Sequence, residues 1–372
     1  MNHPRAVIVL AAGQGTRMKS STPKVLHTMC GRPLLGHAIV AAEETEADHI
    51  VVVIRHQRER VADMVNSFAP HVILADQDEI PGTGRAVQCG LEQLLESTGK
   101  CEGTVLVTSA DVPLLESETL KELTRVHEQA GNAVTLVTTI VEDATGYGRI
   151  VRADGAVEAI VEHRDASEEQ LQIKEINAGI YAFDAQFLRR ALAGLDTDND
   201  QGEVYLTDTV AAAVAAGRTC GAYVLTDHWQ AQGCNDRAQL AQLRAQMNER
   251  ILDRHMKAGV SITMPATTSI DVDVQIAPDV TVEPGCVLEG DTVIEPFAIV
   301  GPHTTLRNVT VGEGAIVPHC FGYDTTIAAG AIIDPFTELP GSGEDTVSPP
   351  PTSGSDAVME PTSSSATATE TN

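Results

Sequence analysis

Short runs of apolar residues alternate with longer amphipathic stretches over the first 228 residues of the chain. The runs are rich in β-branched residues and have the length of buried strands, while the stretches between them have the length and pattern of helices. This alternation predicts an α/β, Rossmann-like domain whose right-handed crossovers build a mostly parallel sheet covered on both faces. The expected strands are residues 7–10, 51–54, 72–75 and 105–110, and the expected helices are residues 33–45, 57–68, 84–95 and 116–130.

A second pattern, with a period of six residues, begins at residue 270. Aliphatic residues recur at every sixth position, and a small or β-branched residue follows four positions after each of the first six. In hexapeptide repeats each aliphatic side chain fills the interior of a parallel β-helix, and six residues form one side of a coil. We therefore expect a short left-handed parallel β-helix of about four coils. The aliphatic positions are Ile270, Ile276, Val282, Leu288, Ile294, Val300 and Leu306.

The remaining segments connect or follow these two units. Residues 235–258 place leucine, methionine and isoleucine on one helical face, which predicts a linking helix with a packing role. After Leu339 the sequence becomes acidic and rich in Ser, Thr and Pro, which predicts a disordered tail. We divide the chain into an α/β domain (1–232), a linking helix (233–260), a short β-helix (261–340) and a tail (341–372).

Charge and cysteine content narrow the possible partners and compartment. Asp and Glu number 52 against 25 Lys and Arg, giving a formal net charge of -27. Such a charge repels DNA, RNA and anionic lipid, and no apolar run has the length of a membrane span, so we expect neither nucleic-acid nor membrane partners. The 7 cysteines show no C-x-x-C spacing, so we interpret them as core residues of a protein in the reducing cytoplasm.

The first apolar run leads into a glycine-rich loop, LAAGQGTRMKSSTPK, at the strand end where parallel sheets bind ligands. Met18 takes the third glycine position of G-x-G-x-x-G, and the P-loop pattern is absent, so neither standard phosphate loop is present. Gly13 and Gly15 still permit a backbone nest for an anion, to which Arg17 and Lys24 add positive charge. The alternative is a tight turn with two surface cations; the pattern favours phosphate binding.

Further motifs follow this loop almost continuously to about residue 339. LAAGQGTRMKSSTPKVLH precedes GTGRAV, SADVPLL, TGYGRIVR, EINAGIYAFD, QGEVYLTD and GCNDRAQLAQL. Together they resemble the GlmU family, which joins an N-acetylglucosamine-1-phosphate uridylyltransferase to a glucosamine-1-phosphate acetyltransferase. The resemblance implies a UDP-N-acetylglucosamine diphosphorylase of peptidoglycan synthesis, which converts UTP and N-acetylglucosamine 1-phosphate into UDP-N-acetylglucosamine and pyrophosphate.

The resemblance also implies which residues form the site. Arg17 would act on the leaving pyrophosphate, and Lys24 would hold phosphate oxygens near the α-phosphorus. On the residues alone, Glu162 fits a solvated strand position and Asn177 a turn. The nucleotide would contact Leu10, Ala11, Ala12, Gly13, Ser109 and Asp111, with Gln77, Gly82 and Thr83 around the uracil, and the sugar would contact Gly148, Glu162, Asn177 and Tyr205.

A magnesium ion is expected as the cofactor, because the two substrates bring many negative charges into an acidic protein. Mg²⁺ prefers oxygen ligands, with few from the protein and the rest from phosphates and water. The resemblance implies that Asp111 and Asn235 are those ligands. Without it, Asp111 reads equally well as a turn residue before Pro113, and Asn235 as a helix N-cap.

Four positions depart from the family pattern. Ala110 replaces a glycine and Ala178 a threonine, while Val204 replaces a tyrosine and Arg85 a histidine. None of these changes deletes a charged or metal-binding group, so the reaction class is retained. They leave two alternatives open, a preference for another sugar 1-phosphate and a non-catalytic protein that binds sugar nucleotides.

The last departure concerns the second activity of the family. DPFTELPGSG (334–343) reaches the point where the acetyltransferase part opens, lacks its arginine and enters the tail. No Lys, Arg or His occurs from residue 320 onward, so this segment offers neither a phosphate clamp nor a histidine base. We expect a truncated β-helix without acetyltransferase activity, rather than a hexapeptide acyltransferase. The resemblance also implies a homotrimer through the β-helix, which the truncation would weaken because it exposes strand edges.

Overall fold

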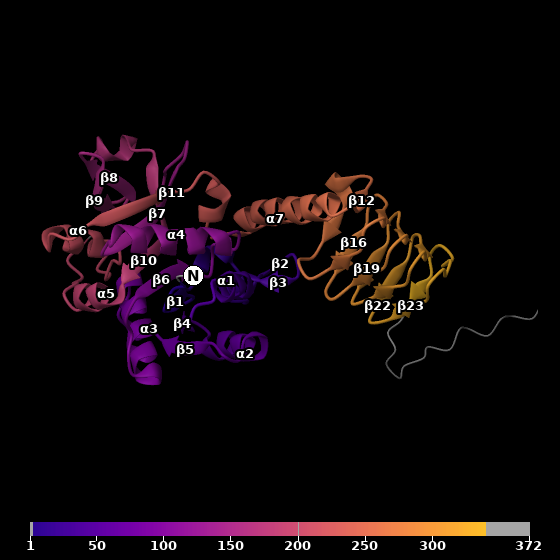
Figure 1. Ribbon diagram of the computed structural model, residues 1–372, viewed down its shortest axis with the longest axis horizontal. Helices are drawn as coiled ribbons and strands as arrows, with labels where there is room; N and C mark the ends of the chain where they lie inside the picture. The colour runs from indigo at the N-terminus through magenta and orange to yellow at the C-terminus, as the bar shows by residue number, and fades with distance from the viewer. Residues whose placement is uncertain (1–2, 200, 340–372) are drawn as a thin grey trace, which may run out of the picture.

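The computed structural model describes residues 3–199 and 201–339 and has an α/β body joined to a β-helix (Figure 1). A 9-stranded sheet forms the centre of the body, in the order β11-β7-β10-β6-β1-β4-β5, with β8 paired to β10 and β9 paired to β8. The four strands expected from the apolar runs are present and parallel, which confirms that prediction. They are β1 (Ala6–Leu10), β4 (His49–Ile54), β5 (Ile73–Asp76) and β6 (Thr104–Ser109).

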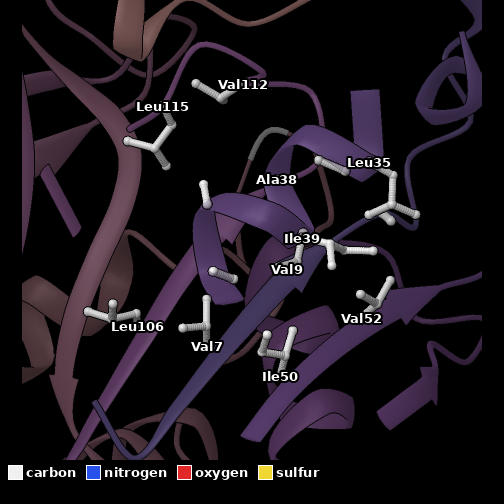
Figure 2. Packing of buried hydrophobic residues seen from close by; sticks show 14 of the residues in the cluster. Val7, Val9, Leu35, Ala38, Ile39, Ile50, Val52, Leu106, Val112 and Leu115 are labelled. Carbon is white, nitrogen blue, oxygen red and sulfur yellow. The ribbon is translucent and has the colours of Figure 1, made fainter. Parts of the chain in front are cut away.

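Helices cover both faces of this sheet, as the alternating pattern predicted. On one face, Leu35, Ala38 and Ile39 of α1 pack on side chains of β1 and β4 (Figure 2). The side chains of β1 that alternate with those point to the other face and pack on a second helical layer. The first layer is α1 (Leu34–Glu43), α2 (Arg58–Phe68) and α4 (Ser117–Ala130), and the second is α3 (Thr83–Thr98), α5 (Ala185–Leu192) and α6 (Asp208–Ala215).

One central strand runs against the others, which the sequence analysis did not anticipate. β10 (Glu175–Asp184) is antiparallel to β6 on one side and to β7 (Val134–Ile140) on the other. Its first residues therefore lie at the same sheet edge as the carboxyl ends of β1 and β6. β11 (Cys220–Val224) completes the sheet parallel to β7, and β8 (Arg149–Ala153) with β9 (Ala156–Val161) forms a hairpin beside β10.

Helix α7 (Arg237–Lys257) links the body to the β-helix (Figure 1). It begins at an N-cap, Asp236, whose side chain accepts a hydrogen bond from the Gln239 backbone N–H. A second connection is the hairpin of β2 (Thr28–Met29) and β3 (Arg32–Pro33), from which Arg32 forms an ion pair with Asp273. The β-helix is thus attached to the body at two places.

The hexapeptide segment forms a parallel β-helix, as predicted, with three stacked sheets of 4, 5 and 4 strands. Val282, Leu288, Val300 and Leu306 are completely buried in its interior. The strands are β12 (Ser261–Ile262), β13 (Ser269–Ile270), β14 (Gln275–Ile276), β15 (Thr281–Val282), β16 (Val287–Glu289), β17 (Val293–Ile294), β18 (Ile299–Val300), β19 (Thr305–Arg307), β20 (Thr310–Val311), β21 (Ile316–Val317), β22 (Phe321–Tyr323), β23 (Thr326–Ile327) and β24 (Glu338–Leu339).

Three further expectations concern the rest of the chain. All seven cysteines are free thiols, and five of them are buried, in keeping with core positions. Within residues 3–199 and 201–339, no helix combines the length and the apolar character needed to cross a membrane. The expected disordered tail lies outside the described residues, and the division into domains stays a prediction.

Candidate active site

A cavity of about 700 Å³ opens at the edge of the sheet where β1, β4, β5 and β6 end. It collects nearly all of the residues that the sequence analysis assigned to substrates, from segments more than 200 positions apart in the chain. Tyr205 is the exception, since it is buried and does not line the cavity. The lining includes Leu10, Ala11, Ala12, Gly13, Arg17, Lys24, Gln77, Gly82, Thr83, Ser109, Asp111, Gly148, Glu162, Asn177 and Asn235.

The glycine-rich loop after β1 is shaped around the stem of Lys24. Gly15 has a φ of +65°, and a Cβ atom there would lie 2.5 Å from the Cβ of Lys24. Any other residue would therefore suffer both backbone strain and a clash. The close approach lets two short helical turns, η1 (Thr16–Met18) and η2 (Lys24–Leu26), hold Arg17 and Lys24 at one cavity.

Each of these two cations contacts a predicted metal ligand. The Lys24 Nζ atom lies 2.6 Å from Asp111 Oδ2, and the Arg17 Nη2 group donates to Asn235 Oδ1 over 2.8 Å. The second oxygen of Asp111 accepts a hydrogen bond of 2.6 Å from Ser109 Oγ. The site thus alternates positive groups with oxygen donors, an arrangement suited to phosphates and a cation.

The two side chains predicted to bind a cation lie near Gly233. A Cβ atom on this glycine would stand 3.9 Å from Asp111 Oδ2 and 3.8 Å from Asn235 Nδ2, so both side chains border the same small space. Among the described residues, no group of three or more His, Cys, Asp or Glu could hold a metal. One carboxylate and one amide fit a magnesium ion, which takes most of its ligands from phosphates and water.

The loop between β5 and α3 carries the residues expected around the base. Gln77 Nε2 donates to the carbonyl oxygens of Ile80 at 2.9 Å and Gly82 at 3.2 Å, which leaves its Oε1 atom as an acceptor. Thr83 Oγ1 accepts from the Leu206 backbone N–H. Gly82, with a φ of +119°, packs so closely on Val204 that a Cβ atom would lie 2.2 Å from the Val204 carbonyl oxygen.

Glu162 and Asn177, two of the residues expected to contact the sugar, also line the cavity. Burial raises the pKa of the Glu162 carboxyl, and the nearby carboxylates Asp165, Asp208 and Glu203 add to the rise. Asn177, in the first part of β10, donates through Nδ2 to the Tyr181 hydroxyl at 2.6 Å. Tyr205 is placed behind this surface, where Gln201 donates to its hydroxyl over 2.6 Å.

Several lining residues were missed by the sequence analysis. Tyr147 lies beside Asp111, and burial raises the pKa of its phenol, an effect that the Asp111 charge increases and a Gln232 hydrogen bond opposes. Arg55 and His56 follow β4, and Gln239 lies in the first turn of α7. The spacing D-x-x-Q at 236–239, typical of a capped helix start, was the available signal for Gln239.

Comparison with known proteins identifies the family to which this chain is similar. The MobA-like NTP transferase domain family matches residues 7–255. The chain is 52% identical to the "Bifunctional protein GlmU" of Kineococcus radiotolerans over 91% of its own length and 69% of that protein. The proteins of the same name from Paenarthrobacter aurescens and Streptomyces avermitilis are 51% and 49% identical over 91% of this chain and 68% and 70% of their own lengths.

The chain belongs to the GlmU family. The expected resemblance is thereby confirmed, with a nucleotidyltransferase domain that begins at the first strand and extends into α7. This GlmU-family chain is a sugar-phosphate uridylyltransferase, a nucleotidyltransferase of the UDP-N-acetylglucosamine diphosphorylase type.

Proposed function

We propose that the protein catalyses the reaction of UTP with N-acetylglucosamine 1-phosphate to give UDP-N-acetylglucosamine and pyrophosphate, with Mg²⁺ as cofactor. A sugar-phosphate oxygen attacks the α-phosphorus of UTP, and the new P–O bond replaces the bond to the pyrophosphate, which leaves with the electron pair. The observation that carries the proposal is the pairing of Lys24 with Asp111 and of Arg17 with Asn235 at one cavity.

Lys24 and Arg17 are assigned to different phosphate groups of the substrates. Lys24, with its ammonium against Asp111, is positioned to hold oxygens of the α-phosphate and of the sugar phosphate. Arg17, beside Asn235, is positioned to stabilise charge on the departing pyrophosphate. Positioning and charge stabilisation are the main contributions to phosphoryl transfer, so no covalent intermediate on the protein is required.

Asp111 and Asn235 are the residues that would hold the magnesium ion. When bound, the ion supplies neutralisation of phosphate charge. Asp111 also accepts from Ser109, which fixes the carboxylate in one orientation toward the cavity. Asp111 and Asn235 line the same cavity, which supports this assignment.

The sugar is assigned to the end of the cavity near Glu162 and Asn177. The Glu162 carboxyl, which accepts a hydrogen bond of 3.4 Å from Thr207, has a further oxygen for a sugar hydroxyl. Gly148 adjoins this group, since a Cβ atom there would lie 3.4 Å from Glu162 Oε1. A carboxylate and an amide suit the hydroxyl and N-acetyl groups of N-acetylglucosamine.

Pyrophosphate release from UTP and N-acetylglucosamine 1-phosphate tests the proposal. We expect turnover that requires Mg²⁺ and falls at least about 100-fold in D111N, because the lost charge acts at the phosphates. D154N, in the exposed turn between β8 and β9, makes the same change far from the cavity and is the control. Binding of UDP-N-acetylglucosamine without turnover would instead identify a non-catalytic binder, and faster turnover of another sugar 1-phosphate would reassign the substrate.

We propose further that this 372-residue chain works in the cytoplasm and lacks acetyltransferase activity. Free thiols at all seven cysteines suit a reducing compartment. The segment 340–372 contains neither a hexapeptide period nor any Lys, Arg or His.

We also propose a homotrimer through the β-helix. Support comes from large apolar side chains on its outer surface, where Phe297 is 60% exposed, Phe321 52% and Ile332 73%. Light scattering of the purified chain tests this assembly, and a monomer at micromolar concentration would contradict it.

A further inference from the structure

Gln239 stands at the start of α7 with its side chain at the edge of the active-site cavity. Its Oε1 atom accepts a hydrogen bond of 2.7 Å from the Asn235 backbone N–H. Its own backbone N–H donates to the N-cap residue Asp236 over 2.8 Å. The first bond holds the side chain beside the predicted metal ligand Asn235, and the second holds the Gln239 backbone in the capped first turn of α7.

The orientation of the Gln239 amide follows from these contacts. A backbone N–H needs an acceptor, so the oxygen of the amide must face Asn235, and the NH₂ group must point the other way. No acceptor within residues 3–199 and 201–339 takes a hydrogen bond from this NH₂ group, whereas the residue lines the cavity. The side chain therefore offers an uncommitted donor to whatever occupies that end of the cavity.

The neighbours of Gln239 indicate which part of the substrate lies there. Arg17, assigned to the pyrophosphate, donates to the side chain of the same Asn235 whose backbone Gln239 holds. Arg237, which follows the N-cap residue Asp236, donates through Nε to the Met18 carbonyl oxygen over 3.3 Å. The first turn of α7 thus contacts the loop that carries Arg17, and both Arg17 and Gln239 line the same cavity.

We infer that Gln239 is a pyrophosphate-binding residue, which donates from Nε2 to an oxygen of the leaving pyrophosphate while its Oε1 holds Asn235 in place. This inference rests on the proposed function, because it takes Arg17 to mark the pyrophosphate end. A different role, helix capping alone, would need the acceptor and not the donor. The two roles can therefore be separated by a substitution that keeps one and removes the other.

Q239E is that substitution, since a carboxylate still accepts from the Asn235 N–H but turns a negative oxygen toward the phosphates. Binding of magnesium pyrophosphate and of UDP-N-acetylglucosamine, each followed by calorimetry, gives a readout that is independent of turnover. We expect at least about a tenfold loss of pyrophosphate affinity, the size of one hydrogen bond to a charged group. Affinity for UDP-N-acetylglucosamine, which leaves the pyrophosphate end empty, should change by no more than about twofold.

Q242E is the matched control, because Gln242 is exposed on the same helix and receives the same change of charge. It should bind both ligands as the unchanged protein does. Pyrophosphate affinity in Q239E within about twofold of the unchanged protein, or equal weakening of both ligands, would overturn the inference. If the unchanged protein neither binds pyrophosphate nor releases it, the proposed function fails instead, so the two failures are distinguishable.

Discussion

Lys24 and Asp111 form an ion pair of 2.6 Å whose side chains are only 12% and 20% exposed. The lysine expected to hold phosphate is therefore paired, before any substrate binds, with the carboxylate expected to hold the metal. In the proposed complex, magnesium would replace Lys24 as the positive partner of Asp111, and a phosphate of UTP would replace Asp111 as the negative partner of Lys24, so both groups would keep an opposite charge beside them. The pair keeps two charged groups in position at a cavity edge where either one alone would be poorly solvated.

The first prediction separates the catalytic from the structural part of this pair. K24M should lower turnover by about 100- to 1000-fold, since it removes a cation directed at the phosphates. It should also lower the melting temperature, because Asp111 is left without its partner. K24M/D111N should regain part of that melting temperature and none of the turnover. A K24M enzyme with more than about a tenth of normal turnover would contradict the assignment of Lys24.

The second prediction concerns the close contact between Gly82 and Val204. G82A places a methyl group against a carbonyl oxygen at a positive φ, so we expect a loss of stability larger than the roughly 1 kcal/mol that positive φ alone costs. G99A is the control, since Gly99 also has a positive φ but nothing lies within 4 Å of its Cβ position. Equal denaturation midpoints for the two variants would show that the loop moves freely away from Val204.

The third prediction uses the raised pKa of Glu162. A carboxyl with a raised pKa in the folded state destabilises that state once it ionises; the cost is absent below the unfolded pKa of about 4.3 and complete above the folded pKa. E162Q cannot ionise, so its melting temperature should rise relative to the unchanged protein as the pH increases through that range. E158Q, on the exposed side of β9, controls for the loss of one negative charge. The same E162Q variant should bind N-acetylglucosamine 1-phosphate more weakly.

The fourth prediction follows from the orientation of Gln77. The NH₂ group of Gln77 is bound to two carbonyl oxygens, and its Oε1 accepts no hydrogen bond within residues 3–199 and 201–339. This oxygen can accept from the N3–H of uracil but cannot pair with the N3 acceptor of cytosine. We expect kcat/KM for UTP to exceed that for CTP at least about 100-fold. Q77E should lower UTP use as well, since a carboxylate would face the two carbonyl oxygens. Comparable rates with both nucleotides would mean that another group reads the base.

The fifth prediction addresses the second activity of the family. Incubation of the 372-residue chain with glucosamine 1-phosphate, acetyl-CoA and a thiol reagent should release no coenzyme A above background. The physical reason is that residues 320–372 contain no cation for the sugar phosphate and no histidine base. Release of free thiol at a rate proportional to enzyme would show that acetyl transfer is built from other residues.

The periodicity of hydrophobic residues correctly predicted most of the fold. The parallel strands and their helices could be predicted because buried strands and amphipathic helices differ in the period of their apolar residues. The β-helix could be predicted because an interior aliphatic residue recurs at every sixth position. The antiparallel direction of β10 could not be predicted, because a buried strand has the same composition whichever way it runs. The burial of Tyr205 outside the cavity lining depends on which side chains meet in space, and spacing along the chain does not encode that. For Gln239, the D-x-x-Q spacing signals the helix cap but not that the side chain lines the cavity.

The antiparallel direction of β10 affects which segments of the chain encode the proposed contacts to the nucleotide and to the sugar. The cavity residues that we propose to contact the nucleotide, up to Asp111, come from the parallel strands and their loops, whereas those proposed to contact the sugar come from positions 145–207, around the reversed strand. The proposed contacts to the nucleotide and to the sugar are therefore encoded by two consecutive segments of the chain, which α4 and β7 separate. A recombination event within that divide would exchange the residues proposed to contact the sugar as one block, and the contacts of Val204 and Leu206 with Gly82 and Thr83 would have to be kept.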